Sequence, residues 1–186
     1  MRSENSLSRL VLASFQAFML VGGIVSEGMA ATIQEGAPAP IYDIQLMSGQ
    51  RFSPTEGSGK VVVINFWASW CEPCRGEMPA LDRYYRKHHE EGLELVAISM
   101  DDPEDVPKAR EIMKQYSFSW ALIRESRVKG YGRIWRIPLT FVIDRQGILR
   151  RDGWFGETGL DEAVLEKTIT PLLAAPRSGN ADPGPR

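Results

Sequence analysis

The chain has 186 residues, of which 43% are hydrophobic and 25% charged, and its formal net charge is −2. This length is typical of one globular domain with short extensions, and the composition is sufficient for a buried core. The slightly acidic balance excludes the cationic surface that nucleic-acid-binding domains use, so we expect no nucleic-acid partner.

Residues 1–30 predict an export signal. Arg2 and Arg9 precede an uncharged, mainly apolar stretch over 10–25, and the small residues Gly28 and Ala30 follow it. A basic start, an apolar run and closely spaced small residues are typical of a secretory signal peptide. The alternative is a retained membrane anchor, although the apolar run is slightly shorter than the roughly 17–25 residues of a spanning helix. Both alternatives predict an exported protein, in the bacterial periplasm or at the outer face of the inner membrane.

The following elements are predicted in chain order. Residues 31–40 contain two prolines and predict a linker, 41–174 a single folded domain, and 175–186 a disordered tail. Within the domain we expect a hairpin over 41–52, a buried strand over 61–67, a helix over 71–91, a strand over 93–100, a helix over 105–116, a short strand over 120–123, a weak helix near 126–133, strands over 139–143 and 148–150, and a last helix with an apolar stripe from 164 to 173.

This alternation predicts an α/β fold with three layers. The central sheet is expected to be mixed and mostly parallel, covered on both faces, with the N-terminal β-hairpin at one edge. Active sites in such sheets lie beyond the carboxyl ends of the strands. Cys71 and Cys74 directly follow the strand over 61–67, so we expect the functional site there.

Cys71 and Cys74 are the only two cysteines of the chain, and they close too small a loop to stabilise a fold of this size. Their spacing favours redox chemistry. Cys71 is expected at the start of a helix, where free backbone N–H groups and the helix dipole favour a thiolate, so it is the predicted attacking thiol. Cys74, one turn further on, is the predicted resolving thiol, and Pro73 occupies a first-turn position where its missing N–H costs nothing.

A metal site is the main alternative for this pair. A zinc site would need two further Cys or His ligands, and the only histidines, His88 and His89, are adjacent on a helix and point about 100° apart. We expect both at an exposed helix end, and we expect no metal. The chain has no Cys-x-x-Cys-His motif, so no haem and no other cofactor is expected. A non-enzymatic module that binds copper through the two cysteines stays open.

Two glutamates lie close to the cysteine pair in the sequence. Glu72 lies between the thiols, where a like charge opposes thiolate formation and lowers the reduction potential, which favours a reductant; the alternative is a solvated side chain without effect. Glu77 lies one turn after Cys74 on the same side of the helix. A partly desolvated carboxylate there would have a raised pKa suited to proton transfer, and the alternative is rotation into solvent.

Two further segments leave alternatives open. The acidic run over 101–105 lies at the end of a strand and could line the site, but we expect Asp102 to cap the next helix, with Pro103 in its first position. Ile137-Pro138 begins a strand, and the residues alone do not decide whether this peptide bond is cis or trans.

Together, these motifs resemble the thioredoxin superfamily, and most closely its exported TlpA/ResA-like branch, over roughly 37–173. The motifs are Asn65-Phe66-Trp67-Ala68-Ser69-Trp70-Cys71-Glu72-Pro73-Cys74, Glu77-Met78-Pro79 and Ile137-Pro138-Leu139-Thr140-Phe141-Val142-Ile143-Asp144.

The resemblance implies a thioredoxin-like fold with a βα insertion around 105–123. It implies that the Ile137–Pro138 bond is cis and faces the dithiol, that Ile137 offers backbone hydrogen bonds to a substrate chain, and that Trp70, Glu72 and Pro73 tune the cysteines. Glu77 takes the place of a glutamate that this branch uses near its resolving cysteine. Asn65 replaces the buried aspartate of thioredoxin and cannot act as a base.

The function implied by the resemblance is a thiol–disulfide oxidoreductase that reduces disulfides in exported proteins, notably apocytochromes c during cytochrome c maturation. A membrane thiol transporter of the CcdA/DsbD type is the implied electron donor, and we expect a monomer. An oxidase or isomerase of exported disulfides is the alternative within the same chemistry.

Overall fold

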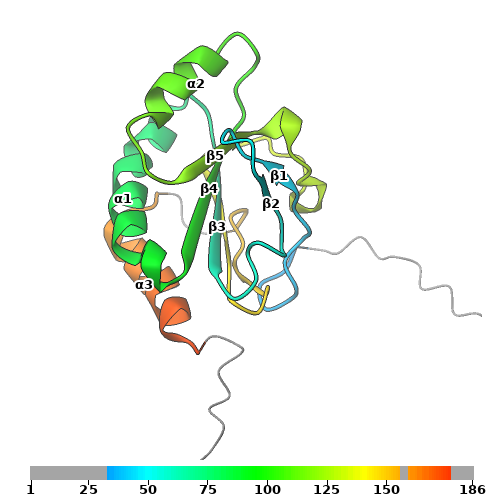
Figure 1. The fold of residues 1–186 in the computed structure, drawn as a ribbon, viewed down its shortest axis with the longest axis vertical. Coiled ribbons are helices and arrows are strands. Elements are labelled where there is room, and N and C mark those ends of the chain that lie inside the picture. Colours follow the sequence, from blue (N-terminus) through cyan, green and yellow to red (C-terminus); the bar gives the residue numbers. More distant parts are fainter. Residues whose placement is uncertain (1–32, 156–158, 177–186) are drawn as a thin grey trace, which may run out of the picture.

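The computed structural model describes residues 33–155 and 159–176, which fold around a five-stranded sheet (Figure 1). The order across this sheet is β5-β4-β3-β6-β7, and β1 and β2 form a separate two-stranded sheet. The strands are β1 (Ile44–Gln45), β2 (Arg51–Phe52), β3 (Val61–Trp67), β4 (Leu93–Ser99), β5 (Ser119–Leu122), β6 (Leu139–Ile143) and β7 (Leu149–Arg151).

The central strand β3 is buried and pairs with a parallel strand on one side and an antiparallel strand on the other. β3 pairs parallel with β4, and β4 parallel with β5, whereas β6 is antiparallel to both β3 and β7. Only β6 therefore runs against the other strands of this sheet, which confirms the predicted mixed, mostly parallel arrangement. Every residue of β3 is buried, and alternate side chains enter two cores: Val61, Val63 and Trp67 on one face, and Val62, Ile64 and Phe66 on the other.

Different elements cover the two faces of the sheet. The helices α1 (Glu72–His88), α2 (Val106–Met113) and α3 (Glu162–Ala174) pack into the first core. The second core is closed by the β1-β2 hairpin and by the short 3₁₀ turns η2 (Ile123–Glu125) and η3 (Lys129–Tyr131). In Figure 1, α1 and α3 lie on one side of the sheet and the hairpin on the other. The predicted three layers are confirmed, with a hairpin and turns in place of helices in the third.

The prediction of a helix near 126–133 is wrong, because the only helical element in this segment is the turn η3. Arg127 is committed to a β-bridge, since its backbone N–H donates to Asp43 O at 2.7 Å and its carbonyl accepts from Asp43 N at 3.0 Å. Gly132 then adopts a φ of 82°, a left-handed conformation that a helix cannot contain. Val128 and Tyr131 point into the second core from this irregular segment.

The expected cap of the next helix is also wrong. α2 begins at Val106, with Asp105 rather than Asp102 in the N-cap position, and the Asp105 side chain makes no capping hydrogen bond. Asp102 lies in the turn before the helix, where its carbonyl accepts from Asp105 N at 3.0 Å.

The end of α1 differs from the expectation for one of its two histidines. α1 is followed by the 3₁₀ turn η1 (His89–Glu91) and by Gly92 in a left-handed conformation, as its position after the helix predicts. His89 is exposed, but His88 is buried. The His88 ring lies 4.4 Å from the Tyr84 ring, and its Nδ1 is 3.1 Å from a carboxylate oxygen of Glu91. His88 is therefore a packed residue and not a surface one.

The chain enters the domain along the edge strand β7, to which it runs antiparallel. Gly36 N donates to Leu149 O at 2.8 Å, Leu149 N to Ala37 O at 2.9 Å and Ala39 N to Gly147 O at 2.9 Å. This part of the expected linker is thus bound along β7. The hairpin lies near the opposite edge of the sheet, because Leu46 forms an isolated bridge with Ala121 of β5.

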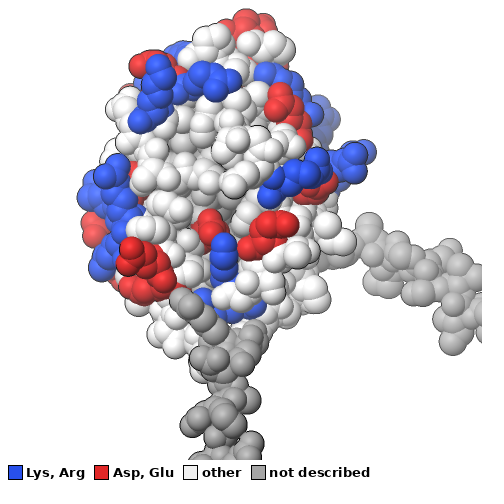
Figure 2. Space-filling view, in the orientation of Figure 1, with Lys and Arg blue, Asp and Glu red and all other residues white. Residues whose placement is uncertain are grey.

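The expected export signal or anchor at 1–30 lies outside the described residues, and so does all of the expected tail over 175–186 except its first two residues. None of the helices in the described ranges is both long and apolar enough to cross a membrane. On the face shown in Figure 2, acidic and basic side chains lie close to one another around the margin and below the centre, and the surface over β5 is mostly uncharged.

Candidate active site

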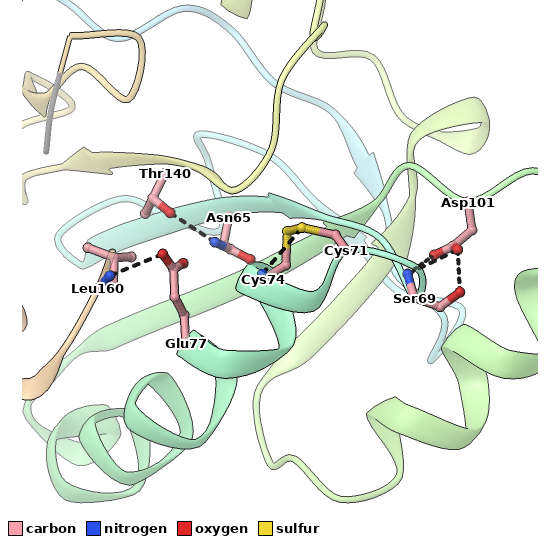
Figure 3. Close-up of a disulfide and its surroundings, with 8 residues drawn as sticks. All are labelled: Asn65, Ser69, Cys71, Cys74, Glu77, Asp101, Thr140 and Leu160. Atoms are coloured by element: carbon pink, nitrogen blue, oxygen red, sulfur yellow. Dashed lines mark hydrogen bonds between the residues drawn. A yellow bond between two sulfur atoms is a disulfide. The ribbon is translucent and has the colours of Figure 1, made fainter. Parts of the chain in front are cut away.

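Cys71 and Cys74 form a disulfide at the start of α1, directly beyond the carboxyl end of β3 (Figure 3). The S–S distance is 2.06 Å and the Cα atoms are 5.3 Å apart. Cys71 is 6% exposed and Cys74 is 2% exposed. The pair is therefore almost enclosed by the protein, and the more exposed cysteine is the one that precedes the helix.

The helix start holds Cys71 in the position expected from the sequence. Cys71 is the N-cap residue of α1, and its Sγ accepts a hydrogen bond from Cys74 N at 3.3 Å. Pro73 occupies one of the first two helical positions, where a backbone N–H has no partner within the helix, so its missing N–H costs no helical hydrogen bond. In the reduced protein, the same Cys74 N–H and the helix dipole would stabilise a thiolate on Cys71.

Glu77 lies one turn beyond Cys74 and points from α1 toward the sheet (Figure 3). Its side chain is buried, and Oε1 accepts from Leu160 N at 3.1 Å. Among the described residues, Oε2 has no hydrogen-bond partner. Burial raises the pKa of Glu77, against the opposing effects of the Leu160 hydrogen bond and the positive charge of Arg151. The expected desolvated carboxylate agrees with this geometry, and the alternative of rotation into solvent does not.

Asn65 is buried on β3 beside the disulfide and Glu77 (Figure 3). Its Nδ2 donates to Thr140 Oγ1 at 2.8 Å, across the β3–β6 pairing in which these two residues are partners. An amide does not accept a proton at neutral pH and carries no charge, so Asn65 cannot act as a base. The carboxylate of Glu77 lies on the same side of the disulfide as Asn65 (Figure 3).

Asp101 and Ser69 form a cluster that the sequence reasoning did not identify. Asp101 is buried, and its carboxylate accepts hydrogen bonds from Ser69 N at 3.0 Å, Ser69 Oγ at 2.6 Å and Ser99 Oγ at 2.7 Å. These bonds fix the loop that carries Trp70 and Cys71 against the end of β4 (Figure 3). The available signal was the acidic run at the end of a strand, which we assigned to helix capping instead.

The Ile137–Pro138 peptide bond is cis, as the resemblance implied. Phe66 pairs with Leu139, so Pro138 lies beyond the same end of the sheet as the cysteine loop. Ile137 and Trp70 line a common cavity of about 380 Å³, together with Met100, Ile134, Trp135 and Arg136. Trp70 and Ile137 are thus brought together at this end of the fold, whereas Glu72 is exposed on the first turn of α1.

The comparisons with known proteins agree with this geometry. The model of the AhpC/TSA family matches residues 36–152. The chain is 31% identical over 140 residues to the thiol-disulfide oxidoreductase ResA of Bacillus cereus, a match that covers 74% of this chain and 79% of that protein. It is 31% identical over 120 residues to the thioredoxin-like protein YneN of Bacillus subtilis, covering 63% of this chain and 70% of that protein.

The fold is also similar to a solved structure. The crystal structure of a thiol:disulfide interchange protein of the thioredoxin family from Chlorobium tepidum superposes with a TM-score of 0.63 at 26% sequence identity. This match covers 77% of the present chain and 99% of the other.

Proposed function

Because the chain belongs to the AhpC/TSA family and is a thiol–disulfide oxidoreductase, we propose that it reduces disulfides in exported proteins, with Cys71 as the attacking thiol and Cys74 as the resolving thiol. The observation that carries this assignment is the position of Cys71, which is the N-cap of α1 and the more exposed of the two cysteines. A thiolate needs both stabilisation and access in order to attack, and Cys71 is favoured in both.

The proposed reaction starts from the reduced protein and has two steps. The Cys71 thiolate attacks one sulfur of the substrate disulfide, so a bond forms between the two proteins and the second substrate sulfur leaves as a thiolate that takes up a proton. Cys74 then loses its proton and attacks the Cys71 sulfur. The bond between the proteins breaks, the remaining substrate sulfur leaves, and Cys71 and Cys74 form the disulfide that the structure contains. Two electrons pass from the dithiol to the substrate.

Glu77 is the proposed base of the second step. It lies one turn from Cys74, burial raises its pKa toward the working pH, and its Oε2 makes no hydrogen bond within the described residues. Asn65 also lies beside the disulfide on this side, hydrogen-bonded to Thr140, and its amide is unable to accept the proton.

The proposed direction of electron flow follows from the charges around the pair. Glu72 stands between the cysteines, Glu77 is buried one turn below them, and Asp101 is buried against the loop that precedes them. Negative charges oppose thiolate formation, which favours the disulfide and lowers the reduction potential. Glu72 contributes least of the three, because its exposed side chain is screened by solvent.

The substrate, the electron donor and the location rest on the sequence. The pattern of residues 1–30 supports export to the periplasm or to the outer face of the inner membrane, and the TlpA/ResA-like motifs support apocytochromes c as substrates and a CcdA/DsbD-type transporter as the donor. Trp70 and Pro73 are proposed to tune the pair, and Ile137 and Pro138 to bind the substrate backbone. The working unit is proposed to be a monomer.

Equilibration of the Cys71–Cys74 pair in redox buffers tests the direction. We expect a reduction potential closer to the thioredoxin value of about −270 mV than to the value of about −120 mV for a strong periplasmic oxidant. A potential near the oxidant value would contradict the reductase assignment and favour an oxidase or isomerase.

Trapping tests the substrate and the roles of the two cysteines together. Cys74→Ser should retain partners as mixed disulfides on Cys71, and Cys71→Ser is the matched control that should retain none. Apocytochromes c among the partners would support the proposed pathway, and partners held by Cys71→Ser alone would reverse the assignment of attacking and resolving thiols.

A further inference from the structure

Two tryptophans are exposed beside the cysteine loop. Trp70 is 58% exposed and Trp135 is 74% exposed, and both line the 380 Å³ cavity that also includes Ile137. Large apolar side chains in water are unfavourable unless a partner covers them, and a cluster of them marks a binding surface.

Trp135 is exposed but held in place by its neighbours. Its ring stacks on the Trp154 ring at a centroid distance of 5.7 Å and an angle of 22°. The guanidinium carbon of Arg136 lies 5.8 Å from the Trp135 ring and 5.6 Å from the Trp154 ring. Cation–π contacts and stacking each stabilise such an arrangement, so this surface is preorganised for binding.

Trp154 and Arg136 are in turn attached to the rest of the domain. Trp154 Nε1 donates to Tyr131 O at 3.0 Å, and Trp154 N donates to Asp152 Oδ1 at 2.9 Å. Arg136 donates to Gly153 O at 3.2 Å and also to Trp154 O. These bonds connect the segment before β6 with the segment after β7, and together they present Trp135 to solvent beside Ile137. We call Trp135, Arg136 and Trp154 the aromatic arm.

The position of the aromatic arm determines what can occupy the cavity. A substrate disulfide must reach Cys71, and Trp70, the residue before Cys71, is itself part of the cavity lining. The polypeptide on one side of the reacting substrate cysteine must therefore lie over the cavity. Its other lining residues are mostly apolar or aromatic, and Arg136 on the wall disfavours a cationic side chain.

We propose that the aromatic arm determines substrate specificity, by binding a bulky apolar or aromatic side chain of the substrate polypeptide next to its reacting cysteine. This inference rests on the proposed role of Cys71 and adds a substrate class to it, namely disulfides in flexible segments that carry such a side chain.

The test uses the full chain, reduced with dithiothreitol and desalted, in single-turnover reactions. The probes are two synthetic peptides with an internal disulfide, identical except for Phe or Ala beside the first cysteine, and hydroxyethyl disulfide, which has no side chain to bind. We expect the wild-type protein to reduce the Phe peptide about 10-fold faster than the Ala peptide, the lower end of what one apolar contact discriminates.

The variants separate the aromatic arm from the redox centre. Trp135→Ala should lose the preference for Phe, Trp135→Phe should keep most of it, and Ile41→Ala, which removes an exposed apolar side chain that is absent from the cavity lining, should leave it unchanged. Ile41→Ala should also reduce hydroxyethyl disulfide at the wild-type rate, and the rate of each variant with this probe is the reference to which its two peptide rates are compared. Equal rates for the two peptides, or a preference that survives in Trp135→Ala, would overturn the inference. Failure of the wild-type protein to reduce any of the three probes would instead overturn the proposed function.

Discussion

Replacing Glu77 with glutamine removes the buried carboxylate beneath the dithiol while keeping the size of the side chain. Glutamine retains an oxygen that can accept the hydrogen bond from Leu160 N, so the turn before α3 keeps its contact. The substitution therefore removes the proton acceptor with little change to the packing around it. We expect Glu77→Gln to slow the attack of Cys74 on the mixed disulfide by about 10²-fold or more, the usual contribution of a positioned general base.

The same substitution slows the reaction but is expected to stabilise the folded protein at neutral pH. Burial raises the pKa of Glu77 above the unfolded value of 4.5, so protonation stabilises the folded state. That stabilisation is complete below pH 4.5 and is lost as the pH rises through the folded pKa. Each unit of the shift corresponds to about 1.4 kcal/mol at a pH above both values. We therefore expect Glu77→Gln to be at least as stable as the wild type at pH 7, and to lose this advantage in acid.

Two measurements check the reasoning. Stopped-flow mixing of the reduced protein with a disulfide peptide, followed by acid quenching, gives the rate at which the mixed disulfide is resolved between pH 5 and 9. Urea unfolding of the oxidised protein at pH 4 and pH 7 gives the difference in free energy of unfolding. If Glu77→Gln resolves the mixed disulfide at the wild-type rate across this pH range, Glu77 is not the base. If the stability of Glu77→Gln relative to the wild type is lower at pH 7 than at pH 4, the desolvation argument is refuted.

Three further substitutions test other parts of the fold. Asp101→Asn removes a charged acceptor from the Ser69 backbone and hydroxyl, so we expect a loss of about 1–3 kcal/mol in urea unfolding and a slower attack by Cys71 in thiol-exchange assays. Asn65→Asp replaces the donor to Thr140 with a buried carboxylate, so we expect destabilisation at pH 7 that is partly recovered at pH 4, and recovery at high pH instead would contradict this. Arg145→Met removes a buried guanidinium that donates to three backbone carbonyls at the far end of the sheet, so we expect a loss of about 3 kcal/mol or more with an unchanged reduction potential.

The sheet could be predicted from the sequence because its signals are local. The β-branched and aromatic run that forms β3 is buried on both faces, and its composition reflects that burial directly. The start of α1 was likewise predictable from the backbone preference of Pro73, and that of Gly92 marks the end of the turn η1 that follows the helix.

The errors arose where a distant partner decides the local structure. The segment around Arg127 was expected to be helical, but Asp43, more than eighty positions earlier in the chain, takes its backbone hydrogen bonds. The acidic run after β4 was expected to cap a helix, but Ser69 binds Asp101 from another loop. His88 was expected on the surface because it lies at the end of a helix, whereas it is buried and packs against Tyr84.

The same limitation applies to the candidate site. The cysteines, Glu77 and the Ile137–Pro138 bond could be located because each belongs to a recognisable motif. The aromatic arm joins Trp135 to Trp154 across the β6–β7 pair, and no spacing in the sequence indicates that these two rings stack.

The attachment of residues 36–39 along the start of β7 fixes the orientation of the dithiol relative to the N-terminal side of the domain. β3 has seven residues, which corresponds to roughly 20 Å of strand between that attachment and the cysteine loop. Residues 35–39 run antiparallel to β7, because Pro38 forms an antiparallel bridge with Ile148 and a Glu35 carboxylate oxygen accepts from Asp152 N, so a carrier joined to the chain before Ile33 would meet the domain beside the edge strand β7. Coupling the protein to a bead through a residue near Trp135 should obstruct the access of large substrates to Cys71, because Trp135 and Trp70 line the same cavity.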